Sequence, residues 1–295
     1  MLIPSPGAAF APPVPAGPWV VVVGMHRSGT SVLAGVVGAL GPALPAGDDL
    51  MGAWVGNPFH YESQALTATG DHLLESLGGS WSAPPRLEPG WATEAVRTHG
   101  ALATAAAALA FPEPGPLVWK DPRTCILLPF WRELLPGPPL AILTWRDPLA
   151  VAGSLARRDG FDLDHGLALW ERYTHDALLG LRGLDTLVVN NEALMSDPRA
   201  VTGAVADWLE GRVVATVAGA TRAAAAAIVT PELQRRHPGA GKEGDLLPSQ
   251  RRLVGQLRRL QGPHRSFWAD LPGLSPRAEE LLAARWATER GAGSR

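Results

Sequence analysis

The sequence predicts an α/β fold in which a central parallel sheet is flanked by helices, and three short apolar runs carry this prediction. They are Trp-Val-Val-Val-Val at 19–23, Leu-Val-Trp at 117–119 and Leu-Ala-Ile-Leu-Thr-Trp at 140–145. Such runs suit parallel strands that are covered on both faces. After the first run, apolar residues recur with helical spacing at Val32, Leu33, Val36 and Val37.

A polar loop, Gly-Met-His-Arg-Ser-Gly-Thr-Ser at 24–31, joins the first strand to the first helix. Gly24 and Gly29 allow a tight turn, so that backbone N–H groups and the helix N-terminus can point at one anion. The planar guanidinium of Arg27 suits phosphate or sulfate oxygens, and further donors come from the hydroxyls of Ser28, Thr30 and Ser31. The loop is therefore predicted to bind a phosphate-like group. His26 is either a supporting donor or a packed ring.

The spacing of the two glycines is that of nucleotide triphosphatases, but Thr30 stands where those proteins have a lysine. A kinase loop without this lysine lacks its contact to the transferred phosphate, and no strand ends in an aspartate suited to magnesium. The cation lies inside the loop, at Arg27. A loop of this kind, followed by Ser-Gly-Thr-Ser, resembles the 5′-phosphosulfate loop of sulfotransferases that use 3′-phosphoadenosine 5′-phosphosulfate (PAPS).

The end of the strand at 140–145 resembles the same family. Arg146 follows this strand directly, and Ser154 comes eight positions later in the next predicted helix. In sulfotransferases an arginine and a serine with this spacing hold the 3′-phosphate of the nucleotide. The arginine can clamp two phosphate oxygens, and the serine can donate from about two helical turns along. The alternative is an arginine paired with Asp147 and an ordinary helix serine.

The strand at 117–119 leads into Lys120-Asp121-Pro122. This sequence is similar to one in tyrosylprotein and many bacterial sulfotransferases, where the lysine lies near the transferred sulfuryl group. Lys120 is then expected to neutralise charge on the bridging oxygen as that group leaves. A salt bridge to Asp121 or a solvated strand end is the competing interpretation. Residues 187–198 resemble the family's later strand, with Asn191 in place of its tyrosine and Ala193 in place of its aspartate.

Residues 44–116 form a long insertion rich in Gly, Pro and Trp, where acceptor recognition is expected. Its segment 56–62, Gly-Asn-Pro-Phe-His-Tyr-Glu, resembles the Asn-Pro-x-Gly-Tyr-x-Glu segment of bacterial sulfotransferases. Transfer to a hydroxyl needs a proton acceptor, for which Glu62 is the first choice and His60 the second. Alternatively, Glu62 caps the next helix and His60 packs on Trp54. An apolar or ring-bearing acceptor is suggested by Trp54, Phe59, Trp81 and Trp91.

Composition limits the class of protein. The chain has 295 residues, a net charge of -2 and one cysteine, Cys125. One cysteine excludes an intramolecular disulfide and a cysteine-built metal site, and a reducing cytoplasm is the expected location. Neither nucleic acid nor a membrane span is predicted, and the oligomeric state is not readable. Residues 1–18, rich in proline and without a basic residue, are expected to be a flexible lead-in.

The predicted organisation is one domain over 19–295 with the three-layer sandwich of P-loop-containing nucleotide hydrolases. The resemblance implies transfer of a sulfuryl group from PAPS, without a metal, to a hydroxyl or amine of a small-molecule, glycan or peptide acceptor. Residues 27–31 would hold the 5′-phosphosulfate, and a basic segment at 235–242 could close over the 3′-phosphate. A P-loop kinase acting on a metabolite is one alternative. A catalytically silent nucleotide-binding protein is the other, expected if Glu62 and Lys120 lie more than ~10 Å from the loop.

Overall fold

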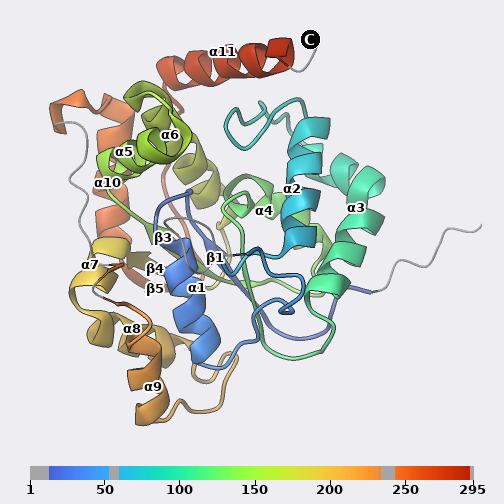
Figure 1. Ribbon diagram of the computed structural model, residues 1–295, viewed down its shortest axis with the longest axis vertical. Coiled ribbons are helices and arrows are strands. Elements are labelled where there is room, and N and C mark those ends of the chain that lie inside the picture. Colours follow the sequence, from blue (N-terminus) through green and yellow to red (C-terminus); the bar gives the residue numbers. More distant parts are fainter. Residues whose placement is uncertain (1–12, 53–59, 231, 234–242, 293–295) are drawn as a thin grey trace, which may run out of the picture.

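A five-stranded sheet lies at the centre of the computed structural model, which describes residues 13–52, 60–230, 232–233 and 243–292 (Figure 1). The strands are β1 (Trp19–Val23), β2 (Leu117–Lys120), β3 (Leu140–Trp145), β4 (Thr186–Asn190) and β5 (Gly262–His264). Their order is β2-β1-β3-β4-β5; the first four are parallel, and β5 pairs antiparallel with β4. The predicted α/β fold with a central parallel sheet is confirmed. The antiparallel edge strand, Gly-Pro-His, carries no apolar run by which it could be predicted.

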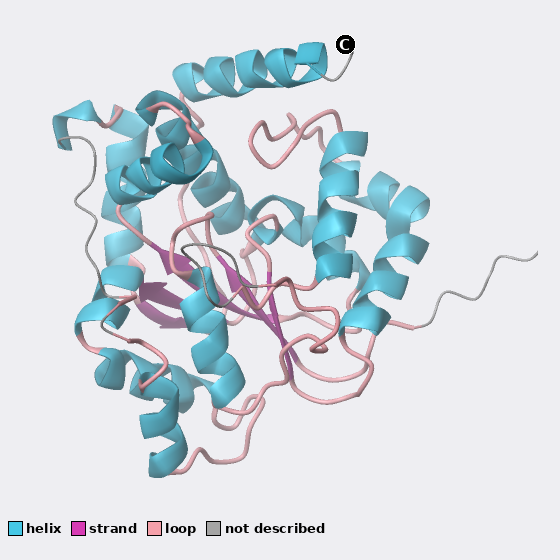
Figure 2. Ribbon diagram, viewed as in Figure 1, coloured by secondary structure: helices cyan, strands magenta, loops and turns pink. Residues whose placement is uncertain are grey.

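Helices cover both faces of the sheet (Figure 2). One apolar core joins the sheet to α1 (Thr30–Ala39), α7 (Asn191–Ser196), α8 (Pro198–Leu209) and α9 (Gly219–Ala226). The other core includes residues of α2 (Gln64–Ser76), α3 (Trp91–Ala110), α4 (Thr124–Leu134), α5 (Pro148–Asp159), α6 (Leu163–Gly180), α10 (Pro248–Arg259) and α11 (Pro276–Ala292). A short 3-10 helix spans Glu243–Asp245. The result is three layers, with helices on either side of the sheet.

Strand β1 shows why its sequence is apolar throughout. Val20 and Val22 belong to the core on the α1 side, whereas Val21 and Val23 belong to the core on the α6 side. Because successive side chains of a strand point to opposite faces, a strand between two helical layers needs apolar residues at both its odd and its even positions. All five residues of β1 are buried.

The insertion at 44–116 contributes two helices, α2 and α3, which pack against each other beside α4 (Figure 1). Helix α2 begins after Ser63, whose hydroxyl accepts a hydrogen bond from the backbone N–H of Leu66 at 3.0 Å. Ser63 is therefore the N-cap of this helix, the position that the alternative interpretation gave to Glu62. The side chain of Glu62 is left for other contacts.

The single cysteine, Cys125, is fully buried at the start of α4. Burial raises the pKa of its thiol, so Cys125 behaves as a small apolar residue. Within the described ranges, none of the helices has the length and apolar character needed to cross a bilayer.

Candidate functional site

The loop between β1 and α1 has the backbone of an anion cradle. Arg27 and Gly29 both have left-handed backbone conformations, with φ of +69° and +86°. The N–H of Ser28 donates to the carbonyl of Met25 at 3.1 Å, which closes the turn. Gly29 caps α1 without a side-chain hydrogen bond, so no side chain of the cap competes for the first N–H groups of the helix. Those groups and the positive end of the helix favour a bound anion.

The cradle has no space for larger residues at its two glycines. A Cβ on Gly24 would lie 2.5 Å from the carbonyl oxygen of Thr144 in β3. A Cβ on Gly29 would lie 1.9 Å from Oδ1 of Asn191, at the start of α7. The loop is therefore enclosed between the carboxyl ends of β3 and β4, the edge of a parallel sheet at which ligands bind.

Gly24→Ala is expected to destabilise the protein by about 1–3 kcal/mol, because the added methyl group meets backbone that cannot rotate away. Gly47→Ala is the matched control, since a Cβ there meets no atom within 4 Å among the described residues beyond its own chain neighbours. Equal unfolding midpoints for the two variants would contradict the close approach of loop and β3.

Arg27, Arg146 and Ser154 meet at this loop. Nε of Arg27 donates to the hydroxyl of Ser154 at 2.8 Å, and Nη1 of Arg146 donates to the carbonyl oxygen of Arg27 at 3.3 Å. Burial lowers the pKa of both Arg27 and Arg146; the charges of Arg158 and Arg146 lower that of Arg27 further, whereas Glu192 partly restores that of Arg146. Positive charges held this close favour an anion between them. The residues predicted for the two ends of one nucleotide thus lie together.

Arg157 and Arg158 extend this positive charge. The charge of Arg158 acts on Arg27, and that of Arg157 acts on both Arg27 and Arg146. They follow Ser154 on α5 by three and four positions, which places them on the same side of the helix. That spacing is the signal by which the sequence could have assigned them to the site.

The carboxylate of Glu192, from the β4–α7 junction, borders the same cluster. One of its oxygens lies 3.9 Å from Nε of Arg146 and accepts the N–H of Asp147 at 3.1 Å. The other accepts a hydrogen bond from Asn190 at 2.7 Å. The Glu192 carboxylate therefore lies just beyond hydrogen-bonding distance of Arg146. An anionic ligand would have to compete with this carboxylate for the guanidinium.

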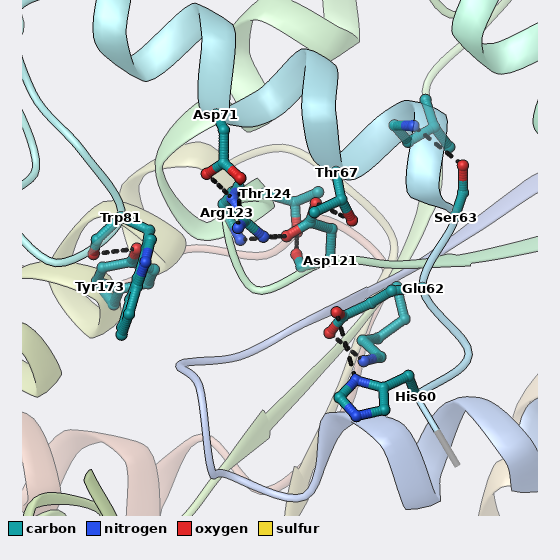
Figure 3. Close-up of polar contacts among 12 residues, drawn as sticks. His60, Glu62, Ser63, Thr67, Asp71, Trp81, Asp121, Arg123, Thr124 and Tyr173 are labelled. Atoms are coloured by element: carbon teal, nitrogen blue, oxygen red, sulfur yellow. Dashed lines mark hydrogen bonds and ion pairs between the residues drawn. The ribbon is translucent and has the colours of Figure 1, made fainter. Parts of the chain in front are cut away.

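Lys120 joins the loop to the insertion. Its ammonium is almost completely buried and donates to the hydroxyl of Ser31 at 3.0 Å and to the carboxylate of Glu62. His60 lies beside the same carboxylate, with Nδ1 3.8 Å from Oε2 (Figure 3). Lys120 and Glu62 thus converge on the phosphate loop, and the alternative salt bridge from Lys120 to Asp121 is replaced by the one to Glu62.

The electrostatics of this pair follow from burial and charge. Burial acts to raise the pKa of Glu62, but the charge of Lys120 and hydrogen bonds from His60 and Lys120 outweigh it and hold the pKa well below its ordinary value. Burial lowers the pKa of Lys120, and the charge of Glu62 partly restores it. The buried lysine is charged because the carboxylate accompanies it.

A second buried ion pair fixes the turn that follows Lys120. The guanidinium of Arg123 makes two hydrogen bonds to Asp71 of α2, at 2.5 and 2.9 Å, and one to Asp121 at 3.1 Å (Figure 3). Thr67, also on α2, donates to the other oxygen of Asp121 at 3.4 Å. This network attaches α2 to the end of β2, and so positions Glu62 and Lys120 relative to each other.

Two further loop positions, Ser28 and Thr30, were predicted to bind the anion. Ser28 and Thr30 are buried in the loop. Tyr61 has a left-handed backbone, with φ of +49°, and its ring packs over Gly35 of α1, which holds the segment of Glu62 against the loop helix. Trp54, Phe59 and the basic segment at 235–242 lie outside the described residues, and so does most of the lead-in at 1–18.

The chain is similar to several proteins of solved structure. No family model and no curated protein matches the chain. It is similar to the sulfotransferase domain of the Synechococcus PCC 7002 olefin synthase, with 16% identity, 92% of this chain and 95% of that chain covered, and a TM-score of 0.43. It is also similar to a sulfotransferase of Mycobacterium tuberculosis, with 15% identity, 72% and 71% covered, and a TM-score of 0.47. A sulfotransferase domain from the curacin biosynthetic pathway has 14% identity, 93% and 98% covered, and a TM-score of 0.40.

Proposed function

We propose that this protein is a sulfotransferase that moves the sulfuryl group of PAPS to a hydroxyl or amine. The observation that carries the proposal is the convergence of Lys120, Arg27, Arg146 and Ser154 on one phosphate-type loop. Lys120 contacts the loop at Ser31 and Arg146 contacts it at Arg27, so cations border both ends of the loop, as a nucleotide with a 5′-phosphosulfate and a 3′-phosphate requires. Sulfuryl transfer also needs no metal when cationic side chains neutralise the leaving oxygen.

In this proposal residues 27–31 bind the 5′-phosphosulfate through backbone N–H groups, hydroxyls and the Arg27 guanidinium. Arg146 and Ser154 bind the 3′-phosphate. Lys120, which reaches the loop at Ser31, neutralises the bridging oxygen as the sulfur leaves it for the acceptor. The transferred group is positioned by fixed side chains rather than by solvent, so little reorganisation is needed in the transition state.

The two alternatives receive less support. A kinase of this fold uses a loop lysine and magnesium, and the loop has Thr30 at the lysine position. A catalytically silent protein was expected if Lys120 and Glu62 lay far from the loop, whereas Nζ of Lys120 lies 3.0 Å from the hydroxyl of Ser31. A buried lysine at a binding loop is a costly arrangement, as is typical of functional sites.

Arg146→Ala is expected to weaken binding of 3′-phosphoadenosine 5′-phosphate by about 10- to 100-fold, since a charge-assisted pair contributes about 1.5–3 kcal/mol. The measurement is calorimetric titration in the absence of metal, run beside ATP with magnesium. Arg97→Ala is the matched control, because Arg97 is an exposed arginine whose ion pair, with Glu94 on α3, is also exposed. Binding of ATP with magnesium alone would contradict the proposal and favour the kinase.

A further inference from the structure

His26 is a half-buried histidine inside the phosphate loop whose contacts leave one ring nitrogen unused. Its imidazole packs against Trp81, with ring centroids 4.8 Å apart, and against Tyr173 at 5.7 Å. Nε2 is buried and finds no hydrogen-bond partner in the part of the chain that the structure describes. Leaving a buried nitrogen without a hydrogen bond is unfavourable, so its presence in a binding loop points to a role in the bound state.

The titratable groups around His26 come from several elements. Lys120 ends β2 and Arg123 follows it, Glu62 precedes α2, Arg158 lies in the last turn of α5, and Tyr173 lies on α6. Burial and then the charge of Arg123 lower the pKa of His26 well below its ordinary value, against an opposing effect of Glu62. At neutral pH the ring is therefore uncharged and has one nitrogen with a free lone pair.

The other two candidates for proton acceptor are already engaged. The carboxylate of Glu62 accepts a hydrogen bond from Lys120, and its pKa is held low by that charge, so it is a weak base. His60 lies against the same carboxylate. His26, by contrast, lies on the loop itself, next to Arg27, and within range of the charges of Lys120 and Glu62.

We infer that His26, through Nε2, accepts the proton of the acceptor group during sulfuryl transfer, while Glu62 keeps Lys120 charged and in place. This inference rests on the proposed function. As the acceptor oxygen or nitrogen attacks sulfur, its proton passes to Nε2, and the bond between sulfur and the bridging oxygen breaks. The bridging oxygen leaves with the electron pair, beside Lys120, and the protonated His26 returns its proton to solvent. No oxidant, reductant or metal is needed.

The Trp81 segment forms the wall that holds His26 in this position. The carbonyl oxygen of Trp81 accepts the hydroxyl hydrogen of Tyr173 at 2.7 Å (Figure 3). The neighbouring hydroxyls of Ser80 and Ser82 donate to the carboxylate of Glu289 on α11, at 2.7 and 2.6 Å. Trp81 is therefore fixed from two sides, and its indole is positioned to contact the acceptor that His26 deprotonates.

His26→Gln tests the assignment with ³⁵S-labelled PAPS, using water, 2-naphthol, tyramine and 1-hexanol as probe acceptors. The variant is expected to lose about 10²- to 10⁴-fold in the rate of sulfuryl transfer and to keep its affinity for 3′-phosphoadenosine 5′-phosphate. In the unaltered protein, kcat/KM should fall as pH drops through the lowered pKa of His26, below about 6.5. This acidic limb should be absent from the residual activity of the variant.

His165→Gln is the matched control, because His165 also has a lowered pKa and a buried Nε2 with no partner among the described residues. It packs on Phe161 and interacts with the backbone of Ser82, beside Trp81, so the rate of this variant should fall far less than that of His26→Gln. Transfer by His26→Gln, including basal hydrolysis to water, within about threefold of the unaltered protein would overturn the inference. So would an acidic limb that persists in His26→Gln and disappears in Glu62→Gln, which would return the role to Glu62. An unaltered protein that binds no bisphosphate would instead overturn the proposed function.

Discussion

Lys120→Met is expected to slow sulfuryl transfer by about 10²- to 10³-fold, because a preorganised cation at the leaving oxygen is lost. The same change leaves the Glu62 carboxylate buried without its partner, which is expected to cost about 3–5 kcal/mol of unfolding free energy. Labelled PAPS turnover measures the first effect, and urea unfolding measures the second. The affinity for the bisphosphate should change far less than the rate.

The double variant Lys120→Met/Glu62→Gln separates the two roles. It removes both charges and is expected to recover most of the lost stability, since no uncompensated ion remains. It should not recover the rate. Because the folded pKa of Glu62 is lowered, the ion pair stabilises the protein at pH values above the ordinary pKa of this carboxyl group. This contribution is lost as the pH falls through the folded pKa. The difference in unfolding free energy between the unaltered protein and the double variant should therefore become smaller in acid. Full activity of Lys120→Met would show that the lysine is only structural.

Arg123→Met is expected to destabilise the protein by about 3–5 kcal/mol, because Asp121 is buried and would lose its only guanidinium contact among the described residues. Asp71 would lose its two hydrogen bonds, and α2 its attachment to the end of β2. Urea unfolding measures the change. Sulfuryl transfer should also fall, since α2 carries the segment that places Glu62.

The pH dependence of this variant has a defined sign. Burial raises the pKa of Asp121 even with Arg123 present, and removal of the arginine should raise it further. A raised folded pKa means that the folded state binds the proton more readily, so the deficit of Arg123→Met should shrink as pH falls through that value. Arg97→Met is the control, because its exposed ion pair is expected to contribute within about 1 kcal/mol. A deficit that is equal at all pH values would contradict the buried carboxylate as its cause.

Local sequence patterns were sufficient to predict three strands of the central sheet and the loop that follows the first of them. The apolar runs that became β1, β2 and β3 were predicted at their observed positions, because a strand buried on both faces must be apolar at every residue. The loop at 24–31 was predicted for a similar reason, since only glycines fit the close approach to β3 and the left-handed backbone of Gly29. Arg146 and Ser154 were paired through the resemblance to sulfotransferases, in which an arginine and a serine have this spacing, and the structure brings both to the loop.

The tertiary structure alone decided which partner each charged side chain takes. Lys120 has Asp121 next to it in sequence, yet its ammonium reaches Glu62, 58 positions away, because residues of one strand alternate between faces while the insertion folds back over the loop. The same packing places the imidazole of His26, for which the sequence left two roles open, against Trp81 with its Nε2 buried. Sequence determined the fold, the anion loop and its cations, since these depend on spacing along one element. Partner choice and proton affinity depend on burial and on charges from distant elements, which exist only once the chain has folded.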